Sequence, residues 1–265
     1  MKFELPGLDT SAWPDVNVDD KVAATASVGV WYHTIDFGDG HVTKGVYDMR
    51  QHVEDYRLPD LQGLEVLDVG ASNGFFTFEL ERRGANVTAV DLPSYRFHDY
   101  PQATLEKKLA GLSDAELSGF DWNQLHGGFL VAHHLLGSKA KRVLTPIYDM
   151  PKVLEPRYDI VFCSTVLVHL RDPVGALEAI RAVVKPGGMA IVATPTHAKD
   201  VGDVAGATFI GYADGPAWWM PAPRTFVDWH KVVGFEHVEI VSQNEVFRVG
   251  GDGFADPVAV VHARK

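Results

Sequence analysis

From residue 65 onward, short apolar runs alternate with segments of helical periodicity. This pattern is typical of a parallel sheet covered by helices on both faces. Five runs are predicted as strands, at 65–69, 87–91, 142–148, 158–163 and 189–194. Two later runs, at 236–242 and 257–263, are expected to pair as an antiparallel edge of the same sheet. The predicted class is therefore α/β, with a doubly wound and mostly parallel sheet.

The segments between these runs carry recognisable helix ends. Asp172 is a candidate N-cap, Pro173 suits the first helical position, and glycines at 187–188 are expected to end that helix. A second helix is predicted to open at 72–74 and to end at Gly84. A third is expected near 223–233.

The first sixty residues have a different pattern. A helix is predicted at 15–26 and a tight turn at 38–40. We interpret residues 1–60 as an N-terminal lid over the sheet and residues 61–265 as the main domain. Residues 195–222, which are rich in glycine, proline and tryptophan, are expected to form an insertion on the substrate side.

Composition narrows the class of protein. The chain has 265 residues with ordinary globular composition, and its one cysteine, Cys163, favours a reducing compartment. We found neither a signal peptide nor an apolar run long enough to span a bilayer, so a cytoplasmic protein with no membrane partner is expected. The net charge of -11 weighs against a nucleic-acid partner. The basic cluster of Lys139, Lys141 and Arg142 is interpreted as a solvated helix end.

The segment at 66–74 reads as a strand, a turn of small residues and the start of a helix. Such a turn allows a ligand to approach the backbone N–H groups at a helix N-terminus. Asp91 closes the next strand, where a carboxylate accepts both hydroxyls of a ribose. Gly70 and Gly74 do not match the dinucleotide spacing, and Asp68 suits an ammonium group better than a pyrophosphate. A nucleoside-type cofactor is predicted here.

The residues DVGASNG resemble the acid-x-Gly-x-Gly-x-Gly signature of class I S-adenosylmethionine methyltransferases, with Ser72 replacing the middle glycine. VTAVDLP, the Tyr-Asp-Met at 148–150, YDIVFCSTVLVHLRDP and VVKPGGMAIVATP resemble the following elements of that family, in order. The resemblance implies a Rossmann-like fold and S-adenosyl-L-methionine as cofactor. The positions it implies for cofactor binding are Asp68, Gly70, Ala71, Ser72, Gly74, Asp91, Leu92, Asp149, Met150 and Ser164.

A narrower resemblance concerns WYHTIDFGDG, VYDMR, HLRDP and WWMPAPRTFVDWHKVVGF. These segments are similar to the methyltransferase branch related to tRNA wobble-uridine carboxymethyltransferases, which use carboxy-S-adenosylmethionine. The tRNA enzymes have a tyrosine directly before the histidine of the fourth-strand turn, whereas this chain has Val168 before His169. Ordinary S-adenosylmethionine is therefore the expected cofactor.

Two histidines are candidates for the base that removes a proton from an acceptor. His169 follows the fourth predicted strand, and His33 lies in the predicted lid, with Asp36 as a candidate to orient either one. The alternative for each is structural: a hydrogen bond within the turn at Asp172, or one within the lid. His133 and His134 are interpreted as structural, and no metal site is predicted.

Aromatic and cationic residues near the predicted lid and insertion suggest an acceptor pocket. The candidate substrate contacts are Tyr32, Tyr47, Arg50, Trp218 and Trp219, and the alternative is ordinary packing, or a solvated side chain for Arg50. The predicted function is transfer of a methyl group to oxygen or nitrogen of a small molecule by in-line displacement. The alternatives are a tRNA wobble-uridine methyl or carboxymethyl transferase and a cofactor-binding subunit that does not catalyse.

Overall fold

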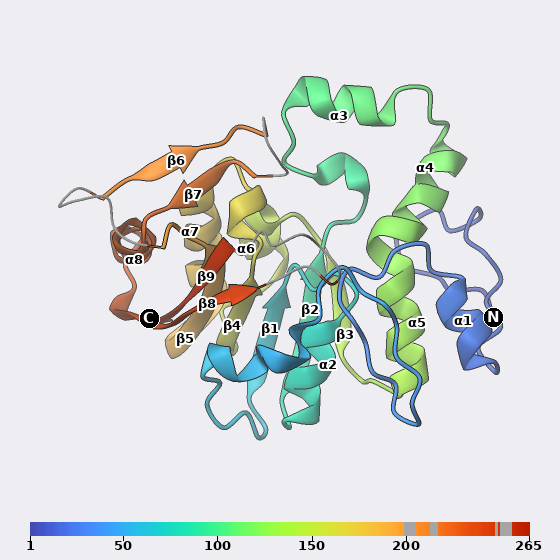
Figure 1. Ribbon diagram of the computed structural model, residues 1–265, viewed down its shortest axis with the longest axis horizontal. Coiled ribbons are helices and arrows are strands. Elements are labelled where there is room, and N and C mark those ends of the chain that lie inside the picture. Colours follow the sequence, from blue (N-terminus) through green and yellow to red (C-terminus); the bar gives the residue numbers. More distant parts are fainter. Residues whose placement is uncertain (199–204, 213–216, 247–248, 250–255) are drawn as a thin grey trace.

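The computed structural model describes residues 1–198, 205–212, 217–246, 249 and 256–265. Within them, one sheet of 7 strands has the order β3-β2-β1-β4-β5-β9-β8 (Figure 1). Its strands are β1 (Glu65–Val69), β2 (Asn86–Asp91), β3 (Lys141–Leu144), β4 (Tyr158–Ser164), β5 (Val184–Pro195), β8 (Glu236–Val246) and β9 (Asp256–Arg264). β1 to β5 are parallel, and β9 pairs antiparallel with both β5 and β8, which confirms the predicted fold class. A separate antiparallel pair consists of β6 (Ala207–Phe209) and β7 (Trp219–Pro221).

Helices cover both faces of the sheet. They are α1 (Lys21–Ala26), α2 (Phe75–Arg82), α3 (Gln102–Leu109), α4 (Asp114–Asp121), α5 (Gly127–Leu136), α6 (Met150–Val153), α7 (Pro173–Val183) and α8 (Pro223–Val232). Short helical turns are η1 (Met49–Gln51), η2 (Val53–Tyr56), η3 (Tyr95–Phe97), η4 (Trp122–His126), η5 (Ile147–Asp149) and η6 (Leu167–His169). Among the described helices, none is long and apolar enough to cross a membrane.

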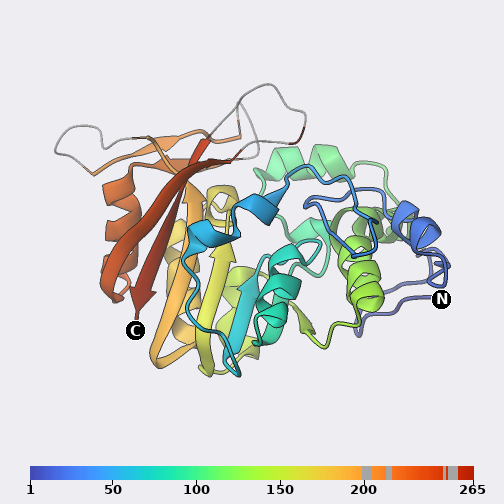
Figure 2. The same ribbon diagram turned by 60° about the horizontal axis from the view of Figure 1, so that its bottom comes forward.

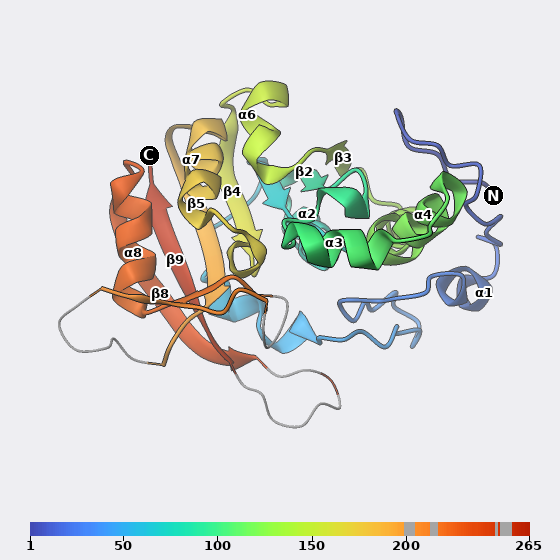
Figure 3. The same ribbon diagram turned by 90° about the horizontal axis from the view of Figure 1, so that it is seen from above.

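The strands alternate their side chains between two cores. On one face, residues of β1, β4 and β5 pack with α7 and α8. On the other face, they pack with α2, α5 and a large part of residues 1–60, including Trp13, Ile35 and Tyr56 (Figure 3). Figure 2 shows the chain from η1 and η2 running across this second face of the sheet. The N-terminal segment therefore shares its core with the sheet.

Several boundaries differ from the sequence prediction. β3 ends at Leu144 and not at residue 148, because Pro146 interrupts the strand and the turn η5 follows. α1 begins at Lys21 and not at 15, because Asp20 caps it by accepting from the Ala23 amide at 3.0 Å. The glycines at 187–188 do not end α7, which stops at Val183; they lie inside β5.

The segment between β2 and β3 is more helical than the sequence pattern indicated. It contains η3, α3, α4, η4 and α5, and a small core of Tyr95, Leu117 and Leu125 fixes it above the sheet edge. α3 has no fully buried residue, which explains why its periodicity was weak. α3, in this segment, and the β6–β7 hairpin both lie beyond the carboxyl ends of the parallel strands (Figure 1).

Candidate functional site

The turn between β1 and α2 is built for close approach to its backbone. Gly70, Ser72 and Gly74 all have positive φ, at 75°, 51° and 88°. A Cβ at Gly70 would lie 2.3 Å from the Val166 side chain, so glycine is required there. Ser72 keeps the left-handed conformation although it is not glycine, which carries a modest steric cost. Ala71 is buried beside the turn.

Asp91 lies at the carboxyl end of β2, next to this turn. Its Oδ2 accepts from the Ser72 amide at 2.7 Å, and its Oδ1 accepts from the Leu92 amide at 2.8 Å. A carboxylate has about four lone-pair directions, so each oxygen keeps capacity for one hydroxyl donor. The predicted pairing of Asp91 with a ribose therefore fits the observed geometry.

Asp68 is buried directly below the turn. It is 2% exposed, and its Oδ2 accepts from the Thr77 hydroxyl at 2.5 Å. Burial raises the pKa of Asp68 to about 7, against the lowering effect of the Thr77 hydrogen bond. Asp68 thus joins β1 to α2 from below the predicted cofactor site.

Arg142 was predicted to be solvated, and this prediction is wrong. Its side chain is 4% exposed, and its Nη2 lies 3.8 Å from Asp91 Oδ2. β3 directs the side chain inward under α5, where the guanidinium stacks on Phe129 with 4.0 Å to the ring centroid. A run of basic letters near a helix end cannot show which one points into the sheet.

At the end of β3, the chain turns through η5 into α6. Met150 is fully buried, whereas Asp149 is partly exposed and pairs with Lys152 at 2.5 Å. Leu92, on the neighbouring strand end, packs against the core of Tyr95 and Leu125. These positions border the same edge of the sheet as Asp91.

The end of β4 is tied to the N-terminal segment. The hydroxyls of Ser164 and Tyr56 lie 2.6 Å apart, and Tyr56 is buried. Thr165 then turns with a φ of 55°, and its amide donates to the Ala193 carbonyl. Sequence reasoning missed Tyr56, because nothing in its spacing connects it with a strand one hundred residues later.

His33 is enclosed near the start of α2. Its ring lies 5.9 Å from the rings of both Phe75 and Phe76, which are buried, and its Nδ1 has no partner within the described residues. Burial lowers the pKa of His33 to about 4. The Asn73 side chain accepts from the backbone amides of Tyr32 and His33, joining the N-terminal segment to the glycine turn.

His169 lies in η6, where the sequence placed it, and is partly exposed. The Tyr212 hydroxyl donates to its carbonyl at 3.3 Å. His98, which sequence reasoning missed, lies close enough to Asp91 and His169 for both to affect it electrostatically. Burial lowers the pKa of His98, and its ring stacks on Tyr100. A histidine in an irregular segment after β2 carries no pattern of its own.

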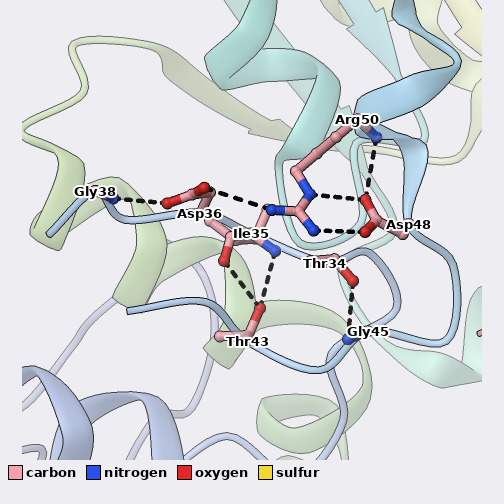
Figure 4. A network of polar contacts seen from close by, with 8 residues as sticks. All are labelled: Thr34, Ile35, Asp36, Gly38, Thr43, Gly45, Asp48 and Arg50. Carbon is pink, nitrogen blue, oxygen red and sulfur yellow. Dashed lines mark hydrogen bonds and ion pairs between the residues drawn. The ribbon is translucent and has the colours of Figure 1, made fainter. Parts of the chain in front are cut away.

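Arg50 and its neighbours form a polar network on the N-terminal segment (Figure 4). The Arg50 guanidinium donates to Asp48 at 2.6 Å and to Asp36 at 3.4 Å. Tyr32 and Tyr47 lie nearby, with ring centroids 5.3 Å apart. In this arrangement Asp36 contacts Gly38 and Arg50.

The two tryptophans of the insertion hold loops together. The Trp218 indole donates to the Asp99 carbonyl at 2.6 Å, and the Trp219 indole donates to the Arg171 carbonyl at 3.0 Å. Asp99 also accepts from the Tyr148 hydroxyl and the Arg171 amide. The hairpin is thereby connected to the ends of β2, β3 and β4. In the described ranges, no three metal-ligating side chains gather.

Comparison with known proteins agrees with this architecture. A family model described as a methyltransferase domain matches residues 42–243. A ubiquinone biosynthesis O-methyltransferase of Bordetella avium is 27% identical over 190 residues, which cover 70% of this chain and 65% of that protein. A tRNA U34 carboxymethyltransferase of Saccharophagus degradans is 25% identical over 191 residues, which cover 71% of this chain and 50% of that protein. The chain thus spans half to two thirds of these relatives.

Among solved structures, a 1,6-didemethyltoxoflavin-N1-methyltransferase of Burkholderia thailandensis matches with a TM-score of 0.52 and 17% identity. The match covers 82% of this chain and 79% of that one, whose structure contains 1,6-didemethyltoxoflavin and S-adenosylhomocysteine. At this identity the likeness establishes the fold.

Proposed function

The chain belongs to the methyltransferase domain family, and from this premise we propose that it moves a methyl group from S-adenosylmethionine to oxygen or nitrogen of a small molecule. The observation that carries the proposal is the glycine turn between β1 and α2, with Asp91 at the end of the adjacent strand. Because β1 and β2 are neighbours in the sheet, the glycine turn and Asp91 lie together at its carboxyl edge.

The surrounding residues suit each part of that cofactor. Asp91 offers acceptor positions for the ribose hydroxyls, and Asp149 at the end of β3 is the candidate for the adenine amine. Ser164, held by Tyr56, borders the methionine end. When bound, the cofactor supplies an electrophilic methyl group on a sulfonium.

The protein's contribution to such a transfer is alignment and exclusion of water. The N-terminal segment closes one side, and the hairpin anchored by Trp218 closes another. His33 is neutral at physiological pH, and its Nδ1 has no partner among the described residues, whereas His169 lies in η6, just after β4. Both are the candidate bases for a hydroxyl acceptor.

Methyl-labelled S-adenosylmethionine tests this function directly, offered with panels of phenols, carboxylic acids and amines and with unmodified tRNA. We expect label in small molecules and loss of transfer in Asp91→Ala. Asp60→Ala is the matched control, since Asp60 is an exposed carboxylate that accepts only from the Gln62 amide among the contacts described. His33→Ala and His169→Ala test the two candidate bases, and full activity in both variants would exclude these two histidines.

The tRNA alternative is retained because of the tRNA-modifying relative. Val168 weighs against it: the side chain is buried, and its carbonyl accepts from the Trp218 amide at 2.8 Å. Valine offers no hydroxyl for the additional carboxylate of carboxy-S-adenosylmethionine. Label in tRNA alone would favour this alternative, and cofactor binding without any transfer would favour a non-catalytic subunit.

A further inference from the structure

Arg142 is a cation enclosed beneath the cofactor turn. Its side chain is 4% exposed, and the side chain of Asp91 is 11% exposed. The two lie on adjacent strands, in register positions that direct them to the same face of the sheet. A buried guanidinium is costly unless it has anionic and hydrogen-bonding partners.

Three contacts define the position of this guanidinium. Nη2 donates to the Leu125 carbonyl at 3.1 Å and lies 3.8 Å from Asp91 Oδ2. The plane stacks on the Phe129 ring, 4.0 Å from its centroid. Nε and Nη1 have no partner in the part of the chain that the structure describes. The cation is therefore held in place by the segment between β2 and β3, with its Nη2 near the Asp91 carboxylate.

We propose that Arg142 is a positioning residue whose charge, next to the Asp91 carboxylate, helps to hold that carboxylate toward the ribose hydroxyls. This inference rests on the proposed function, which assigns the ribose to Asp91. A bound ribose would cover the part of Asp91 that still faces solvent. The nearby cation then offsets the loss of hydration, and a charged carboxylate accepts stronger hydrogen bonds.

Other charged groups around Arg142 do not replace this role. Asp68 lies close enough to interact, but its Oδ2 is engaged by the Thr77 hydroxyl. His126 lies on η4, and burial together with the Arg142 charge lowers its pKa to about 4. His126 is therefore neutral at pH 7 and does not compensate the charge of Arg142. This leaves Asp91 as the carboxylate that links Arg142 to the predicted ribose position.

A double-mutant cycle with calorimetric titration of S-adenosylhomocysteine tests the proposal. In the otherwise unmodified chain, we expect Arg142→Met to raise the dissociation constant about 10- to 100-fold, the size of effect that removal of one nearby charge produces. In the Asp91→Asn background, the same change is expected to alter the dissociation constant less than about twofold. Arg142→Lys, which keeps the charge, should restore part of the affinity.

Arg157→Met is the matched control. Arg157 also stacks on an aromatic ring, that of Tyr158, and pairs with a carboxylate, but it lies at the start of β4, away from the turn. Equal losses from Arg142→Met in both backgrounds would overturn the proposal in favour of a structural role, as would Arg142→Lys behaving like Arg142→Met. Unchanged binding in Asp91→Asn would instead overturn the placement of the ribose.

Discussion

The N-terminal segment, residues 1–60, and the β6–β7 hairpin both border the carboxyl edge of the sheet, but they are held there differently. The N-terminal segment contributes buried side chains such as Trp13, Ile35 and Tyr56 to the core of one sheet face. The hairpin contributes no member to that core, and all three residues of β6 are exposed. It is held by hydrogen bonds from its tryptophans and by other contacts at loop ends, such as that of His197 with Thr208.

This difference distinguishes a segment that is fixed over the site from one that can move away from it. A segment that shares the core cannot leave without unfolding part of the domain, so we propose that the N-terminal segment is a fixed wall of the site. A segment held by a few polar contacts at loop ends exchanges those contacts at much lower cost. We therefore expect changes in the N-terminal segment to affect stability first, and changes in the hairpin to leave the fold intact.

The largest effect is expected for Trp13→Ala. Trp13 is 3% exposed, packs on Trp122 with ring centroids 5.3 Å apart and donates to the Ser118 carbonyl. Its removal should lower the free energy of unfolding by about 3–5 kcal/mol. Trp219→Ala, in the hairpin, should cost about 1 kcal/mol because it loses mainly one hydrogen bond. Urea unfolding measures both, and equal losses would contradict the comparison.

The second-largest expected effect is a dependence of the free energy of unfolding on pH, which arises from the burial of His33. The unfolded chain takes up a proton near the ordinary pKa of 6.5, whereas burial holds the native pKa at about 4. Lower pH therefore favours the unfolded chain, and His33 should remove about 2–3 kcal/mol of stability between pH 6.5 and 4.

Unfolding of His33→Gln across this range isolates that contribution. The variant should lose stability less steeply on acidification than the unmodified chain. Asp68 acts in the opposite direction, since its raised native pKa makes its contribution fall as pH rises from about 4 to about 7. Asp68 is present in both the unmodified chain and His33→Gln, so its contribution cancels when their stabilities are subtracted. If stability depended on pH identically in both, His33 would be accessible to protons in the native state.

Asn73→Ala tests the joint between the N-terminal segment and the glycine turn. It leaves the amides of Tyr32 and His33 without their acceptor, which should cost about 2 kcal/mol. Binding of S-adenosylhomocysteine should weaken about tenfold, or about 1.4 kcal/mol, because the turn loses its anchor. Asn123→Ala is the control, since Asn123 also accepts from an amide of the N-terminal segment, that of Gly29, but lies in η4 and not in the turn. It should lower stability alone; the reverse pattern would contradict the assignment.

The smallest effect is expected at Ser72, in the turn that the two regions flank. Ser72→Gly relieves the steric cost of a φ of 51° but adds freedom to the unfolded chain. The two terms oppose each other, so we expect stability to rise by about 0.5 kcal/mol. The backbone amide that donates to Asp91 is kept, so binding of S-adenosylhomocysteine should stay within about twofold. Thermal unfolding and titration check both expectations.

Much of the fold was predictable because its strands carry buried apolar runs with clear boundaries. β1 agrees with the prediction at both ends, and the antiparallel edge of β8 and β9 was foreseen. The helix α3, between β2 and β3, was not foreseen, because it buries no residue and so shows no strong periodicity.

The candidate site divides in the same way. The turn at Gly70 and the strand end at Asp91 have local signatures, so sequence alone placed them together. Tyr56, His98 and Arg142 have none, because each reaches the site only through tertiary packing. Their roles depend on which way a side chain points, and a single sequence does not encode that locally.

We propose above that the glycine turn between β1 and α2 binds ordinary S-adenosylmethionine together with Asp91. Calorimetric titration of the unmodified chain and of Asp91→Ala with S-adenosylmethionine, S-adenosylhomocysteine and carboxy-S-adenosylmethionine tests it most directly. We expect tighter binding of the first two ligands than of the third. In Asp91→Ala, affinity should fall about 100-fold or more, because a charged hydrogen-bonding partner is removed. Equal binding by Asp91→Ala, or preference for the carboxylated ligand, would contradict it.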